Sequence, residues 1–401
     1  MLVLVINAGS SSIKFQLFNM EDESCQVRGL VDRIHSSESY LSYTVTNQGQ
    51  LGKPLGAVDY YQALERIVAS LTEPTAGVLH DVTEISAVGH RVVHGGEEFV
   101  ASTLITDEVE KAIERCAELA PLHNPPNLMG IRASRRLLPD IPQVAVFDTA
   151  FHQTLPEHAF CYAIPYELYR QLGVRRYGFH GTSFRYVCGR VAELMGQPLA
   201  SLNLVACHLG NGCSIAAVRE GKCIDTSMGL TPLEGLVMGT RAGDIDPALP
   251  AFLTEKLGIN LSEAMDLLNR RSGLLGLSGL SSDVRDLERA MSQGDHRAQL
   301  ALKVYGYRVR KYIGAYAAAL GGLDAVVFTG GVGENSAWVR AEACTGLEFL
   351  GLVLDAQRNR QGDPERFIHA AGARVQVWIV PTNEELMIAR DTAQIARRHH
   401  H

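Results

Sequence analysis

Residues 2–15 read Leu2-Val-Leu-Val-Ile-Asn-Ala-Gly-Ser-Ser-Ser-Ile-Lys-Phe15. The apolar run at the start, rich in Val and Ile, predicts a fully buried strand. From Ile13 onward apolar and polar residues alternate, which predicts a second strand with one solvated face. Between them, Gly9 permits a tight turn, and the serine hydroxyls, backbone N–H groups and Lys14 form a set of donors suited to a polyphosphate. The same segment also fits an ordinary serine-rich hairpin turn.

A second copy of this pattern favours the phosphate-binding interpretation. The segment Leu204-Val-Ala-Cys-His-Leu-Gly-Asn-Gly-Cys-Ser-Ile-Ala-Ala-Val218 again joins an apolar strand, a glycine-containing break and an alternating strand. Gly210 corresponds to Gly9 and Ser214 to Ser12, about 200 residues apart in a chain of 401. A repeat at half the chain length predicts two copies of one domain that face each other and hold one nucleotide from both sides.

Composition sets wide bounds on the class of protein. A chain of 401 residues favours two domains, and 46% hydrophobic with 20% charged residues is typical of globular proteins. The net charge of −7 argues against a nucleic-acid surface. The eight cysteines show neither a CxxC pair nor zinc-site spacing. No apolar run approaches the ~20 residues that span a bilayer, and we read no signal peptide, so we expect a cytoplasmic protein without membrane contact.

Strand-like and helical segments alternate along the chain. Helices are predicted near 107–120, 126–138, 261–270, 283–293 and 296–320. Strand-like runs start at Ile85, Gln143 and Ala325, so the chain is expected to be α/β. A further helix is predicted to begin near Thr182 or Ser183 as its N-cap. No low-complexity linker is present, so the last helix is free to return to the first domain.

The usual nucleotide fingerprints are missing. There is no GxxxxGK[ST], and Gly330-Gly-Val-Gly-Glu-Asn335 lacks the complete GxGxxG. Residues 331–335 are nevertheless the best candidate for an adenosine contact, because their glycines let the backbone lie flat against a purine or a ribose, and a following helix N-terminus favours an α-phosphate. The alternative is a tight turn between a strand and a helix.

Five polar residues are candidates for the chemistry. Arg91 and Arg241 lie beside glycines, and a guanidinium offers a planar fork for a carboxylate or a phosphoryl group. His180 fits either a buried core histidine or a donor to a transferring phosphoryl group. Asp148 and Glu384 follow predicted buried strands, where α/β folds place ligand groups, and either could hold Mg²⁺.

Five motifs together resemble those of the acetate kinase family, from residue 2 to about residue 396. They are Asn7–Phe15, Gly89–Gly96, Arg176–Ser183, His208–Gly212 and Gly330–Asn335.

The resemblance implies the actin and sugar-kinase fold, with two duplicated ribonuclease-H-like domains around a central nucleotide cleft. We expect residues 1–149 plus about 386–398 in the N-terminal domain. Residues 150–385 are expected to form the C-terminal domain, which would carry most of the nucleotide site.

The resemblance also implies individual roles. Asn7 and Glu384 would bind Mg²⁺, with Mn²⁺ as an acceptable substitute. Arg91 would bind the substrate carboxylate, and Asp148 resembles the catalytic acid of the family. His180 and Arg241 would stabilise the transition state. The remaining acetate-pocket positions would be Val93, Leu122, Phe179 and Pro232. The nucleotide positions would be Ser10, Ser12, Lys14, His208, Leu209, Gly210, Asn211, Gly212, Asp283, Val284, Arg285, Gly331, Val332, Gly333, Glu334 and Asn335.

One position departs from the family pattern. Phe184 follows Gly-Thr-Ser where a histidine is common, so a polar group next to His180 is missing. This change could alter the orientation of His180 without abolishing activity.

The implied activity is reversible transfer of the ATP γ-phosphoryl group to acetate, giving acetyl phosphate and ADP, in a homodimer. The carboxylate is ionised at pH 7 and can attack in line without a general base. We therefore hypothesise that Asp148 orients Arg91 or a metal-bound water. Two alternatives remain: a propionate or short-chain acyl kinase, against which Val93 argues, and a non-catalytic actin-like nucleotide-binding module.

Overall fold

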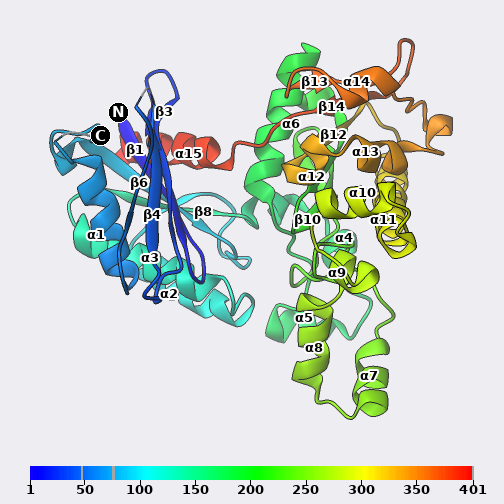
Figure 1. Ribbon diagram of the computed structural model, residues 1–401, viewed down its shortest axis with the longest axis horizontal. Helices are drawn as coiled ribbons and strands as arrows, with labels where there is room; N and C mark the ends of the chain where they lie inside the picture. Colours follow the sequence, from blue (N-terminus) through cyan, green and yellow to red (C-terminus); the bar gives the residue numbers. More distant parts are fainter. Residues whose placement is uncertain (47, 75–76, 400–401) are drawn as a thin grey trace. The chain divides into compact units, whose positions relative to one another are not determined.

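The computed structural model describes residues 1–46, 48–74 and 77–399, which form two compact units (Figure 1). Unit 1 comprises Met1–Ala150 and the C-terminal segment from Asn383, and unit 2 comprises Phe151–Thr382. Ala150 and residues 383–385, which were expected in the second domain, therefore belong to unit 1. Each unit has its own sheet and is described separately below.

The sheet of unit 1 has the strand order β5-β4-β3-β2-β1-β6-β8-β7. Strands β1 to β5 pair antiparallel, whereas β6 pairs parallel with both β1 and β8. The strands are β1 (Leu2–Ala8), β2 (Ile13–Asn19), β3 (Ser24–Asp32), β4 (Tyr40–Val45), β5 (Gly49–Pro54), β6 (Ile85–Val92), β7 (Thr103–Leu104) and β8 (Gln143–Phe147).

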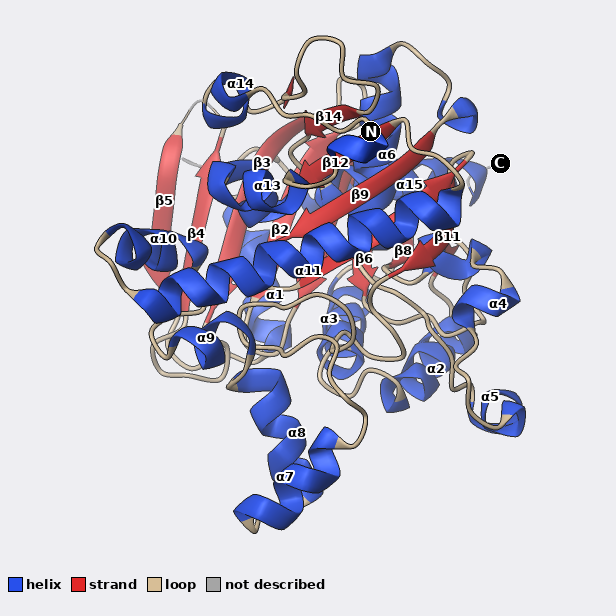
Figure 2. Cartoon of the chain, turned by 90° about the vertical axis from the view of Figure 1, so that its right-hand side faces the viewer, coloured by secondary structure: helices blue, strands red, loops and turns tan. Residues whose placement is uncertain are grey.

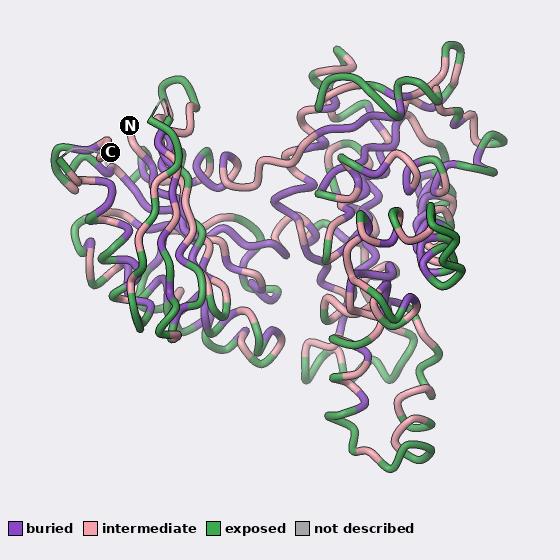
Figure 3. The backbone as a smooth tube through the Cα atoms, in the orientation of Figure 1, coloured by how far each residue is buried: buried purple, intermediate pink, exposed green. Residues whose placement is uncertain are grey.

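Helices cover both faces of this sheet. Leu4 and Ile6 of β1 point into a core shared with α1 (Tyr60–Leu71) and α3 (Asn124–Leu137). On the opposite face, Gly89 of β6 lies directly under α15 (Glu384–His399), where a Cβ would collide with Thr392 and Ile388. Figure 3 shows the central strands as buried. The expected return of the last helix to the first domain is therefore seen.

Unit 2 repeats the same core. Its sheet has the order β11-β10-β9-β12-β14-β13, in which β9, β10 and β11 are antiparallel and β9, β12 and β14 are parallel. Three antiparallel strands followed by two parallel ones is also the order of β3-β2-β1-β6-β8 in unit 1. The predicted duplication of an α/β domain is thus confirmed, and the two hairpins predicted to bind phosphate, β1–β2 and β9–β10, occupy equivalent places in their sheets. The strands are β9 (Asn203–Leu209), β10 (Cys213–Arg219), β11 (Lys222–Thr226), β12 (Ala325–Thr329), β13 (Arg366–Phe367) and β14 (Gln376–Ile379).

Two long helices pack against the sheet of unit 2. The helix α11 (His296–Leu320) crosses β9 and β10, and α6 (Gly181–Met195) packs on β9 and β12 (Figure 2). The predicted N-cap of α6 was wrong, because the cap is His180, whose φ of 58° is left-handed. Few non-glycine residues adopt this conformation, so no helix-start signal marks it.

The remaining helices complete the two units. The predicted helices at 261–270 and 296–320 are confirmed, whereas α4, α5, α7, α9 and α14 were not predicted. Within the described ranges, no helix combines the length and apolar character needed to cross a bilayer. The other helices are α2 (Asp107–Arg115), α4 (Glu157–Phe160), α5 (Tyr166–Leu172), α7 (Leu249–Leu257), α8 (Leu261–Arg270), α9 (Gly273–Ser278), α10 (Val284–Ser292), α12 (Gly330–Asn335), α13 (Ala337–Cys344) and α14 (Ala356–Arg360).

Candidate active site

In unit 1, three charged residues meet at the carboxyl ends of parallel strands. Arg91 lies near the end of β6, Asp148 directly follows the neighbouring strand β8, and Glu384 begins α15. Arg91 Nε donates to both carboxylate oxygens of Asp148, at 3.1 and 3.2 Å, and Nη2 donates at 2.7 Å. Glu384 Oε2 lies 4.0 Å from Arg91 Nε. Asp148 is 1% exposed, while the side chain of Arg91 retains 23% exposure, so the guanidinium connects a buried carboxylate to solvent.

This arrangement shifts the pKa values of Arg91 and Glu384. Burial disfavours the charged form of Arg91, but Asp148 and Glu384 outweigh it and raise the pKa of the guanidinium above its usual range. The pKa of Glu384 is raised to about 7, first by burial and then by the charge of Asp148, against the lowering effect of Arg91. Glu384 is therefore a carboxylate that lacks full compensation of its charge.

The hairpin formed by β1 and β2, which was expected to bind phosphate, lies close to Glu384. Asn7 and Lys14 are cross-strand partners on β1 and β2, and the charge of Lys14 acts on the pKa of Glu384. The turn between the strands is closed by a hydrogen bond from Gly9 N–H to the Ser12 carbonyl at 2.8 Å. The hairpin thus presents an ammonium group and an amide near a carboxylate.

The oxygen atoms of the Asn7 and Glu384 side chains are of the kind that bind a hard cation. The Asn7 amide oxygen and the Glu384 carboxylate are oxygen ligands, which Mg²⁺ prefers. No cluster of three or more His, Cys, Asp or Glu that could hold a metal occurs among the residues whose structure is described. A site with two protein ligands fits Mg²⁺, which keeps several waters and commonly shares substrate phosphates.

In unit 2, two histidines stack on each other. The rings of His180 and His208 are parallel, with centroids 4.2 Å apart and planes 15° apart. A hydrogen bond of 2.8 Å joins His180 Nδ1 to Ser214 Oγ, and another of 2.8 Å joins His208 Nδ1 to Ser183 Oγ. Both serines are fully buried, so each ring is held by a fixed hydroxyl.

Arg241 lies beside this pair. A Cβ placed on Gly212 would be 3.7 Å from both Arg241 Nη1 and His180 Nε2, so both side chains lie against the same point of the β9–β10 hairpin. Arg241 Nη1 donates to the Pro232 carbonyl at 3.1 Å. No carboxylate forms an ion pair with Arg241 in the described part of the chain, and burial lowers the pKa of its guanidinium. A half-buried positive charge without a counter-ion is suited to an anionic ligand.

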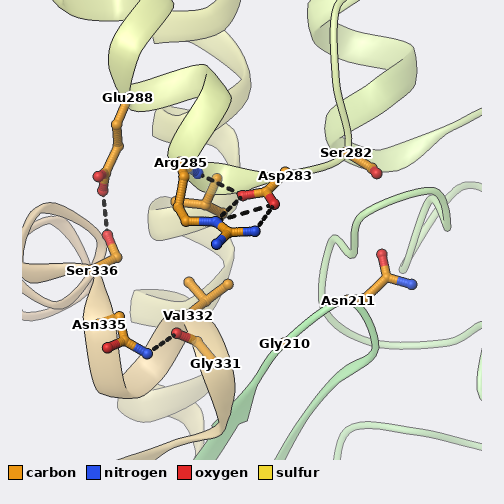
Figure 4. A pocket seen from close by; sticks show the side chains of 11 residues that line it. Gly210, Asn211, Ser282, Asp283, Arg285, Glu288, Gly331, Val332, Asn335 and Ser336 are labelled. Carbon is orange, nitrogen blue, oxygen red and sulfur yellow. Dashed lines mark hydrogen bonds and ion pairs between the residues drawn. The ribbon is translucent and has the colours of Figure 1, made fainter. Parts of the chain in front are cut away.

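A cavity of about 660 Å³ opens next to these residues in unit 2 (Figure 4). Asp283 and Arg285 form a bidentate pair at its mouth, with a shortest distance of 2.6 Å. A Cβ on Gly331 would meet nothing within 4 Å, so the wall is open at this point. The lining residues are Gly210, Asn211, Ser282, Asp283, Val284, Arg285, Glu288, Gly331, Val332, Asn335 and Ser336.

Several expected nucleotide residues lie outside this wall. Gly333 accepts a hydrogen bond of 2.8 Å from the buried Arg340 through its carbonyl. The Glu334 carboxylate accepts from the N–H of Gly330 at 2.9 Å, so it shapes the loop from behind. His208, Leu209 and Gly212 lie on the neighbouring hairpin between β9 and β10, whereas Ser10, Ser12 and Lys14 belong to unit 1.

Besides Arg91, two of the expected acetate-pocket residues belong to unit 1 and two belong to unit 2. Val93 and Leu122 belong to unit 1, and Leu122 is exposed. Phe179 and Pro232 belong to unit 2, and the Phe179 carbonyl is hydrogen bonded to His152 Nε2 at 2.9 Å.

Phe184, which departs from the family pattern, is completely buried and packs edge-on against His208, with ring centroids 6.5 Å apart. Its N–H donates to the His180 carbonyl at 3.0 Å. The side chain of Phe184 therefore supports the stacked pair by packing, while its backbone N–H adds one hydrogen bond to His180.

Sequence reasoning missed three residues of the cavity and one supporting threonine. Ser282, Glu288 and Ser336 line the cavity, and Ser336 donates to Glu288. Thr382 is hydrogen bonded to Ser183 at 2.8 Å. None of these residues carries a motif, although the match of Ser214 with Ser12 in the repeat did mark the serine that holds His180.

Comparisons with known proteins identify the family and the fold. The model of the Acetokinase family matches residues 2–390. Acetate kinase from Thermotoga maritima is 55% identical over 401 residues, which covers 99% of each chain. The crystal structure of Porphyromonas gingivalis acetate kinase superposes with a TM-score of 0.94 at 47% identity, covering 98% of this chain and 99% of the other. A propionate kinase from Francisella tularensis superposes with a TM-score of 0.92 at 43% identity, with the same coverage.

Proposed function

This chain belongs to the acetokinase family, and from that membership we propose that it transfers the γ-phosphoryl group of ATP to acetate. The products are acetyl phosphate and ADP, and the reaction is reversible. The duplicated actin-like fold, a nucleotide-sized cavity in unit 2 and a guanidinium in unit 1 support this function.

The observation that carries the proposal is the hydrogen bonding of Arg91, which fixes one edge of the guanidinium and leaves the other edge open. Asp148 occupies the guanidinium edge formed by Nε and Nη2. Among the described residues no hydrogen bond reaches Nη1, and the side chain is partly exposed. A guanidinium fork with one edge fixed and the other open can bind a carboxylate such as acetate in one orientation.

Unit 2 carries the groups that suit ATP and the transferring phosphoryl group. ATP would place its base in the cavity lined by Val284 and Val332, and its phosphates toward the glycines of the β9–β10 hairpin. Arg241 has no carboxylate partner in the described structure and can compensate the charge that spreads over the transferring phosphoryl group. His180, held by Ser214, can donate to the same group.

The transfer itself needs little covalent chemistry from the protein. The acetate oxygen attacks the γ-phosphorus, the bond to the β,γ-bridging oxygen breaks, and ADP leaves with that electron pair. Acetate is already ionised at pH 7, so no proton has to be removed from the nucleophile. Asp148, fully engaged with Arg91, acts as a positioning residue.

Mg²⁺ would be held by Asn7 and Glu384, with Mn²⁺ as an alternative. When bound, it neutralises the phosphate charge of the nucleotide. The raised pKa of Glu384 supports the assignment, because a buried carboxylate with incomplete charge compensation favours a cation.

Acyl-hydroxamate formation with ATP and Mg²⁺ tests the function, with acetate, propionate and butyrate compared side by side. We expect the highest kcat/KM for acetate, because Val93 would limit the space beyond the carboxylate. One extra methylene is worth about 1–3 kcal/mol in such a pocket, so propionate should react more slowly. A preference for propionate would retain the kinase and refute the pocket argument. No product with any acid would favour a nucleotide-binding module.

We also propose that the enzyme is a homodimer joined through unit 2. Helix α7 has no buried residue, and Phe252, Leu257 and the nearby Leu261 each expose more than half of their surface. Apolar residues gathered on one helical hairpin favour an interface with a second copy. Light scattering should give twice the chain mass, and Phe252→Glu should give the monomer.

A cytoplasmic location is the remaining part of the proposal. All eight cysteines are free thiols and most are buried, which suits a reducing compartment.

A further inference from the structure

Thr382 lies where the chain passes from unit 2 back to unit 1. It is the last residue of unit 2, and the chain continues through Asn383 to Glu384 at the start of α15. Its hydroxyl is hydrogen bonded to Ser183 Oγ at 2.8 Å, although 199 residues separate the two. Neither residue touches the nucleotide cavity or the Arg91 site.

Ser183 connects Thr382 to the stacked histidines. Its Oγ is 2.8 Å from His208 Nδ1 as well as from Thr382 Oγ1, and the side chain is fully buried. A serine hydroxyl has one proton and two lone pairs, so it can donate to the ring and accept from the threonine at the same time. When Ser183 donates to His208, the Nδ1 atom of the ring is the acceptor and the ring proton lies on Nε2. The ring of His208 then provides the surface on which His180 stacks at 4.2 Å.

The backbone of Thr382 makes a second connection. Its N–H donates to Glu334 Oε1 at 3.3 Å, and the same oxygen accepts from Gly330 N–H at 2.9 Å. Gly330 opens helix α12, whose next residues, Gly331 and Val332, line the cavity. Thr382 therefore contacts, through one intermediate each, the histidine pair and the nucleotide loop.

We propose that Thr382 is a positioning residue for phosphoryl transfer. Its hydroxyl orders Ser183 and fixes the ring of His208, and thereby the stacked ring of His180, relative to the nucleotide loop that Glu334 anchors. The inference rests on the proposed function, since it assigns His180 to the transferring phosphoryl group. It goes beyond that function because Thr382 and Ser183 are not among the residues assigned to acetate, nucleotide or metal binding.

The first test compares Thr382→Val with Thr382→Ser. Valine removes the hydroxyl, keeps the shape and retains the N–H to Glu334, whereas serine keeps the hydroxyl. We expect Thr382→Val to lower kcat about three- to tenfold, the effect of one lost orienting hydrogen bond. The KM for acetate should not change, because the hydrogen bonds of Thr382 and Ser183 in the described structure reach none of the residues assigned to acetate. Thr382→Ser should restore kcat. The matched control is Thr392→Val, since Thr392 is buried and its hydroxyl donates only to the Ile388 carbonyl of its own helix.

A double-mutant cycle with Ser183→Ala separates positioning from general destabilisation. Ser183→Ala breaks the same chain of hydrogen bonds, so the double variant should lose no more kcat than Ser183→Ala alone. Additive losses, or an unchanged kcat in Thr382→Val, would overturn the inference. If Thr382→Val fails to fold, Ser183→Ala still has to lower kcat at unchanged acetate KM. Wild-type enzyme without activity on acetate would instead refute the proposed function.

Discussion

Asp148→Asn tests how the carboxylate of unit 1 acts. Asp148 accepts three hydrogen-bond contacts from Arg91, two from Nε and one from Nη2. An asparagine offers one carbonyl oxygen, and its NH₂ group faces a guanidinium that can only donate. The open edge of Arg91 would lose its fixed orientation, and the guanidinium would be drawn toward Glu384, which lies 4.0 Å away.

The magnitude follows from the burial of the pair. Asp148 is 1% exposed and Arg91 23%, so Asp148→Asn removes one partner of a largely buried ion pair, which costs about 3–5 kcal/mol. If that cost falls on acetate binding and transfer, kcat/KM for acetate should drop by about 10² to 10³·⁵. The negative charge of Asp148 also raises the pKa of Glu384, so the variant should move any limb governed by Glu384 to lower pH.

The assay is acyl-hydroxamate formation across pH 5 to 9, with urea unfolding measured in parallel to separate stability from catalysis. Asp140→Asn makes the same change at an exposed carboxylate and serves as the control. We expect both limbs of the pH profile to persist at a reduced maximum. Loss of one limb at an undiminished maximal rate would show that Asp148 transfers a proton and would refute the positioning role.

Three further changes give distinct signatures. Arg241→Ala should lower kcat about 10²- to 10³-fold, as for removal of one transition-state donor, while the free energy of unfolding in urea should not fall, because burial already disfavours this charge. Gly331→Leu should raise the KM for ATP and leave the KM for acetate and the Tm unchanged, because a Cβ there meets only open space. In metal-free protein the pKa of Glu384 is raised from 4.5 to about 7, so the folded state favours the protonated form and stability declines as pH rises through this window. Glu384→Gln should abolish that decline in urea unfolding with a chelator; a decline that persists would assign it to another group.

The duplicated core was predictable because its signal is local. The hairpins β1–β2 and β9–β10 each combine a buried strand, a glycine-containing turn and an alternating strand, and each half carries one. Helix α7 gave no such signal. It has Pro250 near its start, no side-chain cap and no buried face, so its residues show no helical period.

The site was predictable only as separate pieces. Arg91 and Asp148 could be placed at strand ends, but their bidentate pairing depends on the neighbouring positions of β6 and β8. The left-handed cap at His180 and the bond from Ser183 to Thr382 have no sequence signature. They arise from tertiary packing between segments far apart in the chain.

The return of α15 to unit 1 has a consequence for synthesis on the ribosome. Unit 2 is continuous from Phe151 to Thr382 and is complete once those residues have emerged. Unit 1 starts first but needs α15 to cover Gly89 of β6 and its neighbouring strands. Until α15 has been made, this face of the sheet lacks the helix that covers it and is open to aggregation or to a chaperone. The unit whose synthesis begins first therefore cannot complete its fold until all of unit 2 has been made.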